Sequence, residues 1–395
     1  MSDHPADNAT INRLCDDLII RWSEAGQEKS ARWQSEKSLQ PPQQVKVIDD
    51  RMPADNAYRL ACEGTALLWR SDFQNAKQLL QAMARRIDKK RSTSKHLPAE
   101  LSVADTFHRY RLMQSQRAQI LDKLLIPFEA DHTIALPRAP DIRHACLEAY
   151  GPRNEPYVAS LREQLGLIGA HEWGKKVINI PVLVITIHPH YGVFSPVRNE
   201  YIQLIAQTAL PKILTMQSIA FDIGTGTGVL AVILAQRGVQ RIVATDHDPR
   251  ALDCARDNLL RLGFIEKLEL LQTDLFPQGQ AALIVCNPPW IPARPASPME
   301  HAIFDPENRM LRGFLQGLRD HLLPGGEGWL ILSDIAEHLG LRSRAELLHM
   351  IDTAGLKIIS KSDVKPHHPR VSDTSDPLHT ARTRELTSLW QLATK

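Results

Sequence analysis

The spacing of apolar residues changes character near residue 165 of this 395-residue chain. Before that point, apolar positions recur every three or four residues, which predicts a mainly helical N-terminal region over 1–165. The clearest patterns predict helices over 56–88 and 105–125. Prolines divide the rest of this region into short pieces, and no internal repeat is present.

Residues 166–217 are rich in β-branched residues and interrupted by prolines, which predicts an extended or hairpin linker. From residue 218 onward, strands alternate with helices of about ten to fifteen residues. The expected strands are 218–222, 241–246, 267–274, 281–287 and 328–334, with KIISKSDV and ELTSLWQL as a closing pair. This alternation predicts a doubly wound α/β domain over 218–395, with a mostly parallel sheet covered on both faces.

A glycine-rich segment follows the first of these strands, with its acidic and small residues at Asp222, Gly224, Thr225, Gly226 and Gly228. This is the turn at which an α/β sheet binds a ligand against main-chain NH groups. The dinucleotide fingerprint GxGxxG/A requires Gly or Ala where this chain has Val229, which disfavours a nicotinamide-dependent dehydrogenase. An acidic residue before GxGxG is instead typical of sites that hold the methionine portion of S-adenosylmethionine.

Two aspartates end the next two strands. Asp246 lies eighteen residues after Gly228, at the usual place of a carboxylate that accepts hydrogen bonds from ribose hydroxyls. Asp274 is positioned to accept from an adenine amino group, with Leu275 near the ring. A single aspartate after a strand is more often a turn former. Two of them beside a glycine loop favour ligand binding.

The fourth strand ends in Asn287, Pro288, Pro289 and Trp290. An amide or exocyclic amine is a poor nucleophile, since its nitrogen lone pair is delocalised. Acceptors at Asn287 Oδ1 and the Pro288 carbonyl would hold such a planar NH2 group and stabilise the positive charge that grows on nitrogen. Trp290 would provide a flat surface for the base or amide plane. Asn287 lies at the strand tip that faces the predicted cofactor.

The net charge and the cysteine content limit which partners and metals we expect for this chain. The chain has 47 Lys and Arg against 45 Asp and Glu, so its net charge of +2 provides no global attraction for nucleic acid. The 5 cysteines form no CxxC pair, and no cysteine or carboxylate falls at ligand spacing around His188, His190, His367 and His368, so we expect no metal site. The start of the chain lacks a signal-peptide pattern, and no apolar run approaches the ~18 residues of a membrane helix. We therefore expect a cytoplasmic protein without membrane contact.

With these elements in order, residues 175–395 resemble class I S-adenosylmethionine-dependent methyltransferases, specifically the amino methyltransferases with an NPPY-type motif, here NPPW. That group includes the HemK-like glutamine methyltransferases of release factors and the small-domain ribosomal RNA guanine methyltransferases. The resemblance implies a seven-stranded sheet with the last strand antiparallel, S-adenosylmethionine as cofactor and no metal. It also implies a gate over cofactor and substrate within 191–200, with Phe194 and Glu200 as its key positions.

The predicted function is N-methylation of a planar NH2 group on a macromolecule, with a protein glutamine amide, as in a release factor, favoured as substrate. Two alternatives stay open. One is an exocyclic amine of adenine or guanine in RNA or DNA, for which the basic run at 85–95 offers phosphate contacts. The other is a cofactor-binding adaptor without catalysis. Residues 1–165 are expected to recognise the substrate, and the sequence predicts no oligomeric state.

Overall fold

The computed structural model describes residues 18–37, 39–93, 101–175, 178–196, 200–215, 219–296, 298–366, 374 and 376–395. These residues form two compact units. The N-terminal unit comprises the described residues before Glu100 together with Arg109–Trp173. The C-terminal unit comprises the described residues of Glu100–His108 and of Gly174–Lys395. No helix in these ranges is both long enough and apolar enough to cross a membrane.

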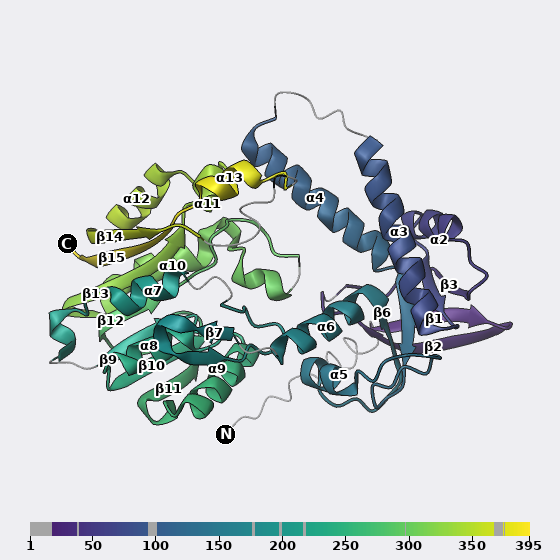
Figure 1. The fold of residues 1–395 in the computed structure, drawn as a ribbon, viewed down its shortest axis with the longest axis horizontal. Helices are drawn as coiled ribbons and strands as arrows, with labels where there is room; N and C mark the ends of the chain where they lie inside the picture. Colours follow the sequence, from purple (N-terminus) through teal and green to yellow (C-terminus); the bar gives the residue numbers. More distant parts are fainter. Residues whose placement is uncertain are drawn as a thin grey trace, which may run out of the picture. The chain divides into compact units, whose positions relative to one another are not determined.

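A seven-stranded sheet forms the centre of the C-terminal unit, in the order β11-β10-β9-β12-β13-β15-β14 (Figure 1). Neighbouring strands are parallel from β11 to β13, whereas β15 is antiparallel to both β13 and β14. The predicted doubly wound α/β sheet is confirmed, including the antiparallel last strand. The strands are β9 (Ile219–Ile223), β10 (Arg241–Asp246), β11 (Leu268–Gln272), β12 (Ala281–Cys286), β13 (Leu322–Ser333), β14 (Leu356–Val364) and β15 (Thr387–Thr394).

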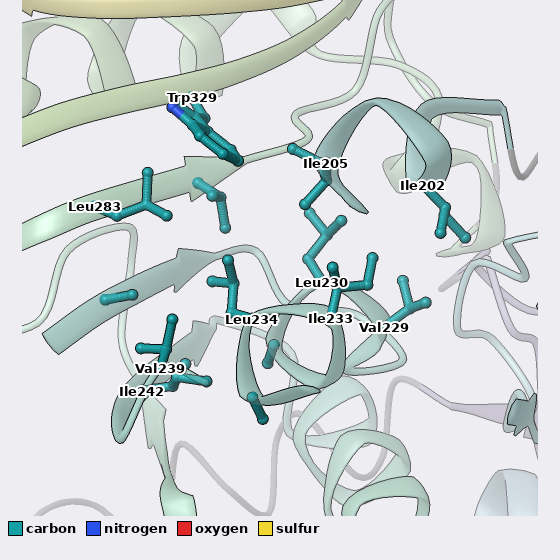
Figure 2. Packing of buried hydrophobic residues seen from close by; sticks show 14 of the residues in the cluster. Ile202, Ile205, Val229, Leu230, Ile233, Leu234, Val239, Ile242, Leu283 and Trp329 are labelled. Atoms are coloured by element: carbon teal, nitrogen blue, oxygen red, sulfur yellow. The ribbon is translucent and has the colours of Figure 1, made fainter. Parts of the chain in front are cut away.

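Successive side chains of each strand point to opposite faces of the sheet, and apolar side chains lie on both faces. On one face, Leu230 and Leu234 of helix α8 pack with Leu283 and Trp329 of the sheet (Figure 2). On the other face, helices α10 and α12 cover Phe221 and its neighbours. Each fully buried large apolar side chain contributes about 1.5–3 kcal/mol, so both layers stabilise the sheet. The helices are α7 (Glu200–Gln207), α8 (Val229–Gln236), α9 (Pro249–Leu262), α10 (Arg309–His321), α11 (Ile335–His338), α12 (Arg344–Thr353) and α13 (His379–Arg384).

The N-terminal unit contains a six-stranded mixed sheet in the order β1-β2-β6-β5-β4-β3. Its strands are β1 (Ile19–Glu24), β2 (Gln27–Gln34), β3 (Val45–Ile48), β4 (Ala66–Trp69), β5 (Leu124–Phe128) and β6 (Tyr157–Ser160). Its helices are α2 (Ala54–Cys62), α3 (Phe73–Thr93), α4 (Val103–Leu121, which begins in the other unit), α5 (Arg143–Tyr150) and α6 (Leu161–Gly174). The expectation of a mainly helical region is therefore incomplete, because its helices accompany a sheet that the apolar spacing does not predict.

The single helix predicted over 56–88 is wrong. Helix α2 ends at Cys62, and Gly64 follows with a φ of +95°, a conformation that favours glycine and ends helices. Ala66–Trp69 form the buried strand β4, and α3 begins only at Phe73. A four-residue apolar strand between two helices has no period of its own, so helical spacing continues through it by chance.

The segment 166–217 is partly extended and partly helical. The predicted hairpin is present as β7 (Ile178–Ile180) and β8 (Ile185–Ile187), which pair antiparallel. Helix α6, however, continues to Gly174, and α7 occupies Glu200–Gln207. The hairpin and α7 pack on the same apolar cluster as α8, so these elements are a layer of the C-terminal unit and not a free linker.

Candidate active site

The carboxyl ends of three adjacent strands meet at one edge of the seven-stranded sheet. Ile223, the last residue of β9, pairs with Thr245 on β10 and with Cys286 on β12. The glycine-rich turn, Asp246 and Asn287 therefore leave the sheet side by side, at the edge where open α/β sheets bind ligands.

The glycine-rich turn is held against the end of β10. The NH groups of Gly224 and Thr225 both donate to the Thr245 carbonyl at 2.9 Å, and Gly228 NH donates back to the Thr225 carbonyl. Gly228 has a φ of +81°, and a Cβ atom there would lie 3.3 Å from the Cα and Cβ atoms of Ala255. Only glycine satisfies both the left-handed backbone and the close approach of α9 without strain.

Asp222 is fully buried beneath this turn. Its Oδ2 accepts from the Thr225 hydroxyl at 2.7 Å and from Ala231 NH at 3.1 Å. Its Oδ1 is buried and has no hydrogen-bond partner in the described part of the chain. Burial raises the pKa of Asp222 to about 7, the two donors lower it, and the carboxylate of Asp246 raises it. A buried carboxyl with one unpartnered oxygen is suited to a cationic ligand.

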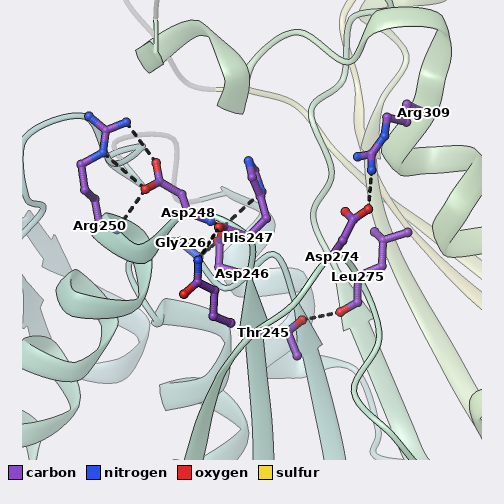
Figure 3. A network of polar contacts seen from close by, with 10 residues as sticks. Gly226, Thr245, Asp246, His247, Asp248, Arg250, Asp274, Leu275 and Arg309 are labelled. Carbon is purple, nitrogen blue, oxygen red and sulfur yellow. Dashed lines mark hydrogen bonds and ion pairs between the residues drawn. The ribbon is translucent and has the colours of Figure 1, made fainter. Parts of the chain in front are cut away.

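Asp246 links the glycine turn to the next loop (Figure 3). Its Oδ2 accepts from Gly226 NH at 3.1 Å, and its Oδ1 accepts from Asp248 NH at 3.0 Å. Burial raises the pKa of Asp246, and these two donors partly offset the shift. Asp248 caps α9 by accepting from Arg250 NH, as expected for a helix that begins with proline. Asp246 therefore presents a carboxylate of fixed orientation.

Asp274 and Leu275 lie apart from these groups. The Asp274 side chain is 55% exposed and forms an ion pair with Arg309, as Figure 3 shows. The Leu275 carbonyl accepts from the Thr245 hydroxyl at 2.6 Å, while its side chain packs against Gly313 of α10. A contact of Asp274 with adenine therefore requires its ion pair to open, and the predicted role of both residues stays a prediction.

The Asn-Pro-Pro-Trp segment follows directly on β12. The indole Nε1 of Trp290 donates to Asn287 Oδ1 at 2.9 Å. Trp290 also packs against the apolar clusters of both sheet faces, so its ring is held in place. The hydrogen bond fixes which end of the Asn287 amide is the acceptor, and a carbonyl oxygen keeps a second lone pair for another donor. Sequence reasoning assigned Trp290 to stacking and missed this bond.

The two gate residues have different surroundings. The Phe194 side chain is 39% exposed, whereas Glu200 is buried at the start of α7. The pKa of the neighbouring Tyr201 is raised by burial and by the carboxylates of Glu200 and Asp222, so Tyr201 lies near the carboxylate beneath the glycine turn. Arg198, which belongs to the predicted gate segment 191–200, lies outside the described residues.

A side chain of α9 fastens the chain that leads into the gate. Asn258 is buried, its Oδ1 accepts from His188 NH at 2.8 Å, and its Nδ2 donates to the carbonyls of His188 and Thr227. One asparagine therefore couples the residues before the gate to the glycine turn.

One cavity of about 660 Å³ joins these groups within the C-terminal unit. Of the residues expected at the site, its walls include Phe194, Gly224, Thr225, Gly226, Asp246, Asn287, Pro288, Pro289 and Trp290. Asp222 and Gly228 lie beneath the turn, and Glu200, Asp274 and Leu275 do not reach the walls.

The wall also contains residues that sequence reasoning missed, and four of them carry polar or polarisable groups or contact the glycine turn. Arg250 follows the Asp248 cap, Met310 lies against Gly224, and Arg382 and Glu385 come from the C-terminal α13 region. Arg382 pairs with Asp376 at 2.7 Å, and Glu385 accepts from the Ser333 hydroxyl at 2.7 Å. No motif marks these positions, because only the tertiary fold brings them to the cavity.

Other candidate groups have local partners. His301 lines the cavity, whereas Arg312 donates to the Glu307 carbonyl. His190 Nε2 lies 3.0 Å from Asp257, and Arg86 in the basic run pairs with Asp55. His367 and His368 lie outside the described residues, as do the side chains at 90–95.

Several known proteins are similar in sequence to this chain. Residues 204–297 match the family of ribosomal protein L11 methyltransferase (PrmA). The chain is 33% identical over 158 residues to release factor glutamine methyltransferase from Cereibacter sphaeroides, a match that covers 35% of this chain and 52% of that protein. It is 30% identical over 161 residues to tRNA1(Val) (adenine(37)-N6)-methyltransferase from Bacteroides thetaiotaomicron, covering 39% of this chain and 67% of that protein. The chain thus spans about half the length of the first relative.

A solved structure of ribosomal protein L11 methylase from Lactobacillus delbrueckii subsp. bulgaricus aligns with a TM-score of 0.34 at 18% identity, covering 51% of this chain and 81% of that one. The family rests instead on the tRNA methyltransferase, matched over two thirds of its length, and on a strand order that places a glycine turn at the end of the central strand. The chain belongs to the class I S-adenosylmethionine-dependent methyltransferases.

Proposed function

We propose that this protein transfers the methyl group of S-adenosylmethionine to the nitrogen of a planar NH2 group on a macromolecule. The observation that carries the proposal is the position of Asn287. Its strand is in register with the strand that ends in the glycine turn, and both ends line the same cavity. An amide acceptor is thereby set next to a site for a cationic cofactor.

The residues on the glycine side fit S-adenosylmethionine. The partnerless Oδ1 of Asp222 lies in a position to stabilise positive charge from beneath the turn, and the cofactor has both an ammonium and a sulfonium group. Asp246 keeps lone pairs for ribose hydroxyls after accepting two main-chain NH groups. When bound there, the cofactor supplies an electrophilic methyl group on sulfur.

The Asn287 side chain and the Pro288 carbonyl provide the acceptor side. Each accepts one N–H of the substrate, which orients the NH2 group and stabilises the positive charge developing on its nitrogen. Trp290 keeps Asn287 Oδ1 in one orientation through the 2.9 Å hydrogen bond, so the acceptor is set before substrate arrives. Such preorganisation costs nothing during the reaction.

The favoured substrate is a protein glutamine amide. The similarity to release factor glutamine methyltransferase supports this choice, and the balanced net charge of +2 offers no general attraction for a polyanion. Residues 1–165 would then provide the substrate-recognition region.

An exocyclic amine of adenine is the second candidate. It is supported by the match to tRNA1(Val) (adenine(37)-N6)-methyltransferase, of which a larger share is covered than of the glutamine enzyme. The same acceptor geometry serves an adenine amino group. In this case substrate binding falls steeply with salt, because each neutralised phosphate releases counterions.

Methyl-labelled cofactor tests the proposal directly. The enzyme is incubated with lysate of a strain that lacks it, and the product is digested separately with protease and with nuclease. We expect label that protease releases and that nuclease leaves intact; release by nuclease alone would identify the nucleic-acid substrate. If wild type and Asn287→Ala label the lysate equally, or not at all, the methyltransferase proposal fails and a non-catalytic adaptor is favoured.

A further inference from the structure

Three side chains of metal-ligating type converge in the N-terminal unit, which contains none of the residues that line the cavity. They are His144 and Glu148 of α5 and His171 of α6, and their ligand atoms all lie within 4.8 Å of one another. Among the residues that the structure describes, no other group of three meets this condition. We propose that these three residues bind a divalent transition-metal ion, zinc in the first instance.

The spacing on α5 suits a shared ligand. Residues four positions apart lie on one face of a helix, which is how two side chains of a helix reach the same ion. His171 brings a third donor from α6, with its Nδ1 2.7 Å from Glu148 Oε2. The rings of His144 and His171 have centroids 5.2 Å apart. The ligand atoms of the carboxylate and of both imidazoles therefore lie close together.

Little movement is needed to close this group around an ion. Ligands of tetrahedral zinc at about 2.0–2.3 Å lie roughly 3.4 Å from one another. No two of the ligand atoms here lie more than 4.8 Å apart, and the side chains of His144 and Glu148 are exposed.

The two helices are already fixed to each other below the group. Gln164 of α6 donates to the Tyr150 hydroxyl at 2.8 Å, and Cys146 Sγ approaches Gln164 Oε1 at 3.7 Å. Gln164 and Cys146 are fully buried. His171 follows Gln164 by two helical turns and so lies on the same face of α6. The backbone positions of the three ligands are thus preorganised.

The donor set selects the ion. Two imidazoles and one carboxylate match zinc sites that keep a fourth position for water, and they also suit nickel or copper. Calcium and magnesium require more oxygen ligands than this group provides. An ordinary ion pair between His171 and Glu148 accounts for the positions of these two side chains, but it does not account for the position of His144 beside them.

Linear spacing brings together only His144 and Glu148, because His171 lies 23 positions after Glu148. The sequence-based expectation of no metal considered only the histidine pairs at 188 and 190 and at 367 and 368. An ion here joins α5 to α6 and stabilises the folded N-terminal unit by binding only the native arrangement. The inference does not depend on the proposed methyl transfer.

The test is a zinc titration of the full chain, free of an affinity tag and stripped of metal, against a chromophoric chelator. We expect His144→Ala and His171→Ala each to weaken zinc binding by at least about tenfold. His349→Ala, at an exposed histidine of α12, and Cys62→Ser, at an exposed thiol, are the matched controls and should change affinity less than about twofold.

Thermal unfolding gives the second readout. Zinc should raise the unfolding midpoint of wild type and of His349→Ala, but not that of His171→Ala. Circular dichroism without zinc shows whether each variant is folded, and Glu148→Gln replaces His171→Ala if the latter is not. Wild-type zinc affinity in folded His144→Ala and His171→Ala, or an equal rise in midpoint with and without His171, would overturn the site.

Discussion

The two sides of the cavity are built in different ways. On the glycine side, Asp222 and Asp246 are held mainly by main-chain NH groups and covered by protein. On the acceptor side, Asn287 is oriented by one indole, and Phe194 is partly exposed. A small, constant ligand suits a site formed by backbone, whereas a macromolecule requires an open entrance. Substitutions should therefore affect cofactor binding on one side and methyl transfer on the other.

Asn287→Ala should have the largest effect. Loss of one preorganised acceptor lowers the rate of methyl transfer by about 10²–10³-fold, the range found when a single oxyanion-hole donor is removed. Initial rates at saturating cofactor provide the measurement. Asn179→Ala, at an exposed asparagine of β7, is the control and should retain wild-type rates. A loss of less than about threefold in Asn287→Ala would remove it from the catalytic machinery.

Gly228→Ala should destabilise the glycine side. A left-handed backbone costs a non-glycine residue roughly 1–2 kcal/mol, and Ala255 leaves no room for the added methyl group. Denaturant unfolding measures the change. Gly166→Ala in α6 is a matched control, because its backbone is helical and nothing lies within 4 Å of the added carbon, so it should be neutral or stabilising. Equal destabilisation by both substitutions would contradict the assigned strain.

Cofactor affinity should fall below about pH 7. The pKa of Asp222 is raised to about 7, and a bound cation favours its charged form, so binding expels a proton at lower pH. The expected loss is about tenfold between pH 8 and pH 6. Without cofactor, the free energy of unfolding changes with pH in the opposite direction. The folded chain holds this proton more tightly than the unfolded chain, so the stability that the proton provides is lost as pH rises through 7. Asp222→Asn should flatten both profiles, and unchanged profiles in that variant would assign them to another group.

Trp290→Phe should have the smallest effect. Phenylalanine keeps the packing against both clusters but cannot donate to Asn287 Oδ1, and a hydrogen bond contributes about 0.5–1.5 kcal/mol. The maximal rate should fall between about twofold and tenfold, with cofactor affinity unchanged. Rate and affinity measured on the same preparation separate this effect from misfolding. A purely structural role of the indole predicts a lower unfolding midpoint at an unchanged rate.

The two sheets show how much of the fold the sequence predicts. In the C-terminal unit, strands such as β9 and β10 are apolar runs that end at a turn residue and are followed directly by a helix, so the alternation of strand and helix can be predicted. In the N-terminal unit, strands such as β4 and β6 have four buried residues each and lie between helices. Runs of that length have no period to distinguish strand from helix. Pairing partners from distant parts of the chain make them strands.

The site shows the same division. The glycine turn, Asp246 and Asn287 are predictable because strand ends in a parallel sheet converge on one edge. Met310, Arg382 and Glu385 join the cavity only through tertiary packing. Asp274 follows the expected pattern along the chain, yet its side chain pairs with Arg309 in the folded protein. The position of a residue after a strand predicts where its side chain leaves the sheet, but it does not predict which residue that side chain contacts.

The central claim is that different residues of one cavity bind the cofactor and support methyl transfer. Calorimetric titration of S-adenosylmethionine into Asp246→Ala and Asn287→Ala tests it most directly. We predict that Asp246→Ala loses at least about tenfold in affinity, because ribose hydroxyls lose a charged acceptor. Asn287→Ala should bind the cofactor within about twofold of wild type, while its rate of methyl transfer falls by about 10²–10³-fold. Equal loss of affinity in both variants, or wild-type affinity in Asp246→Ala, would contradict this account.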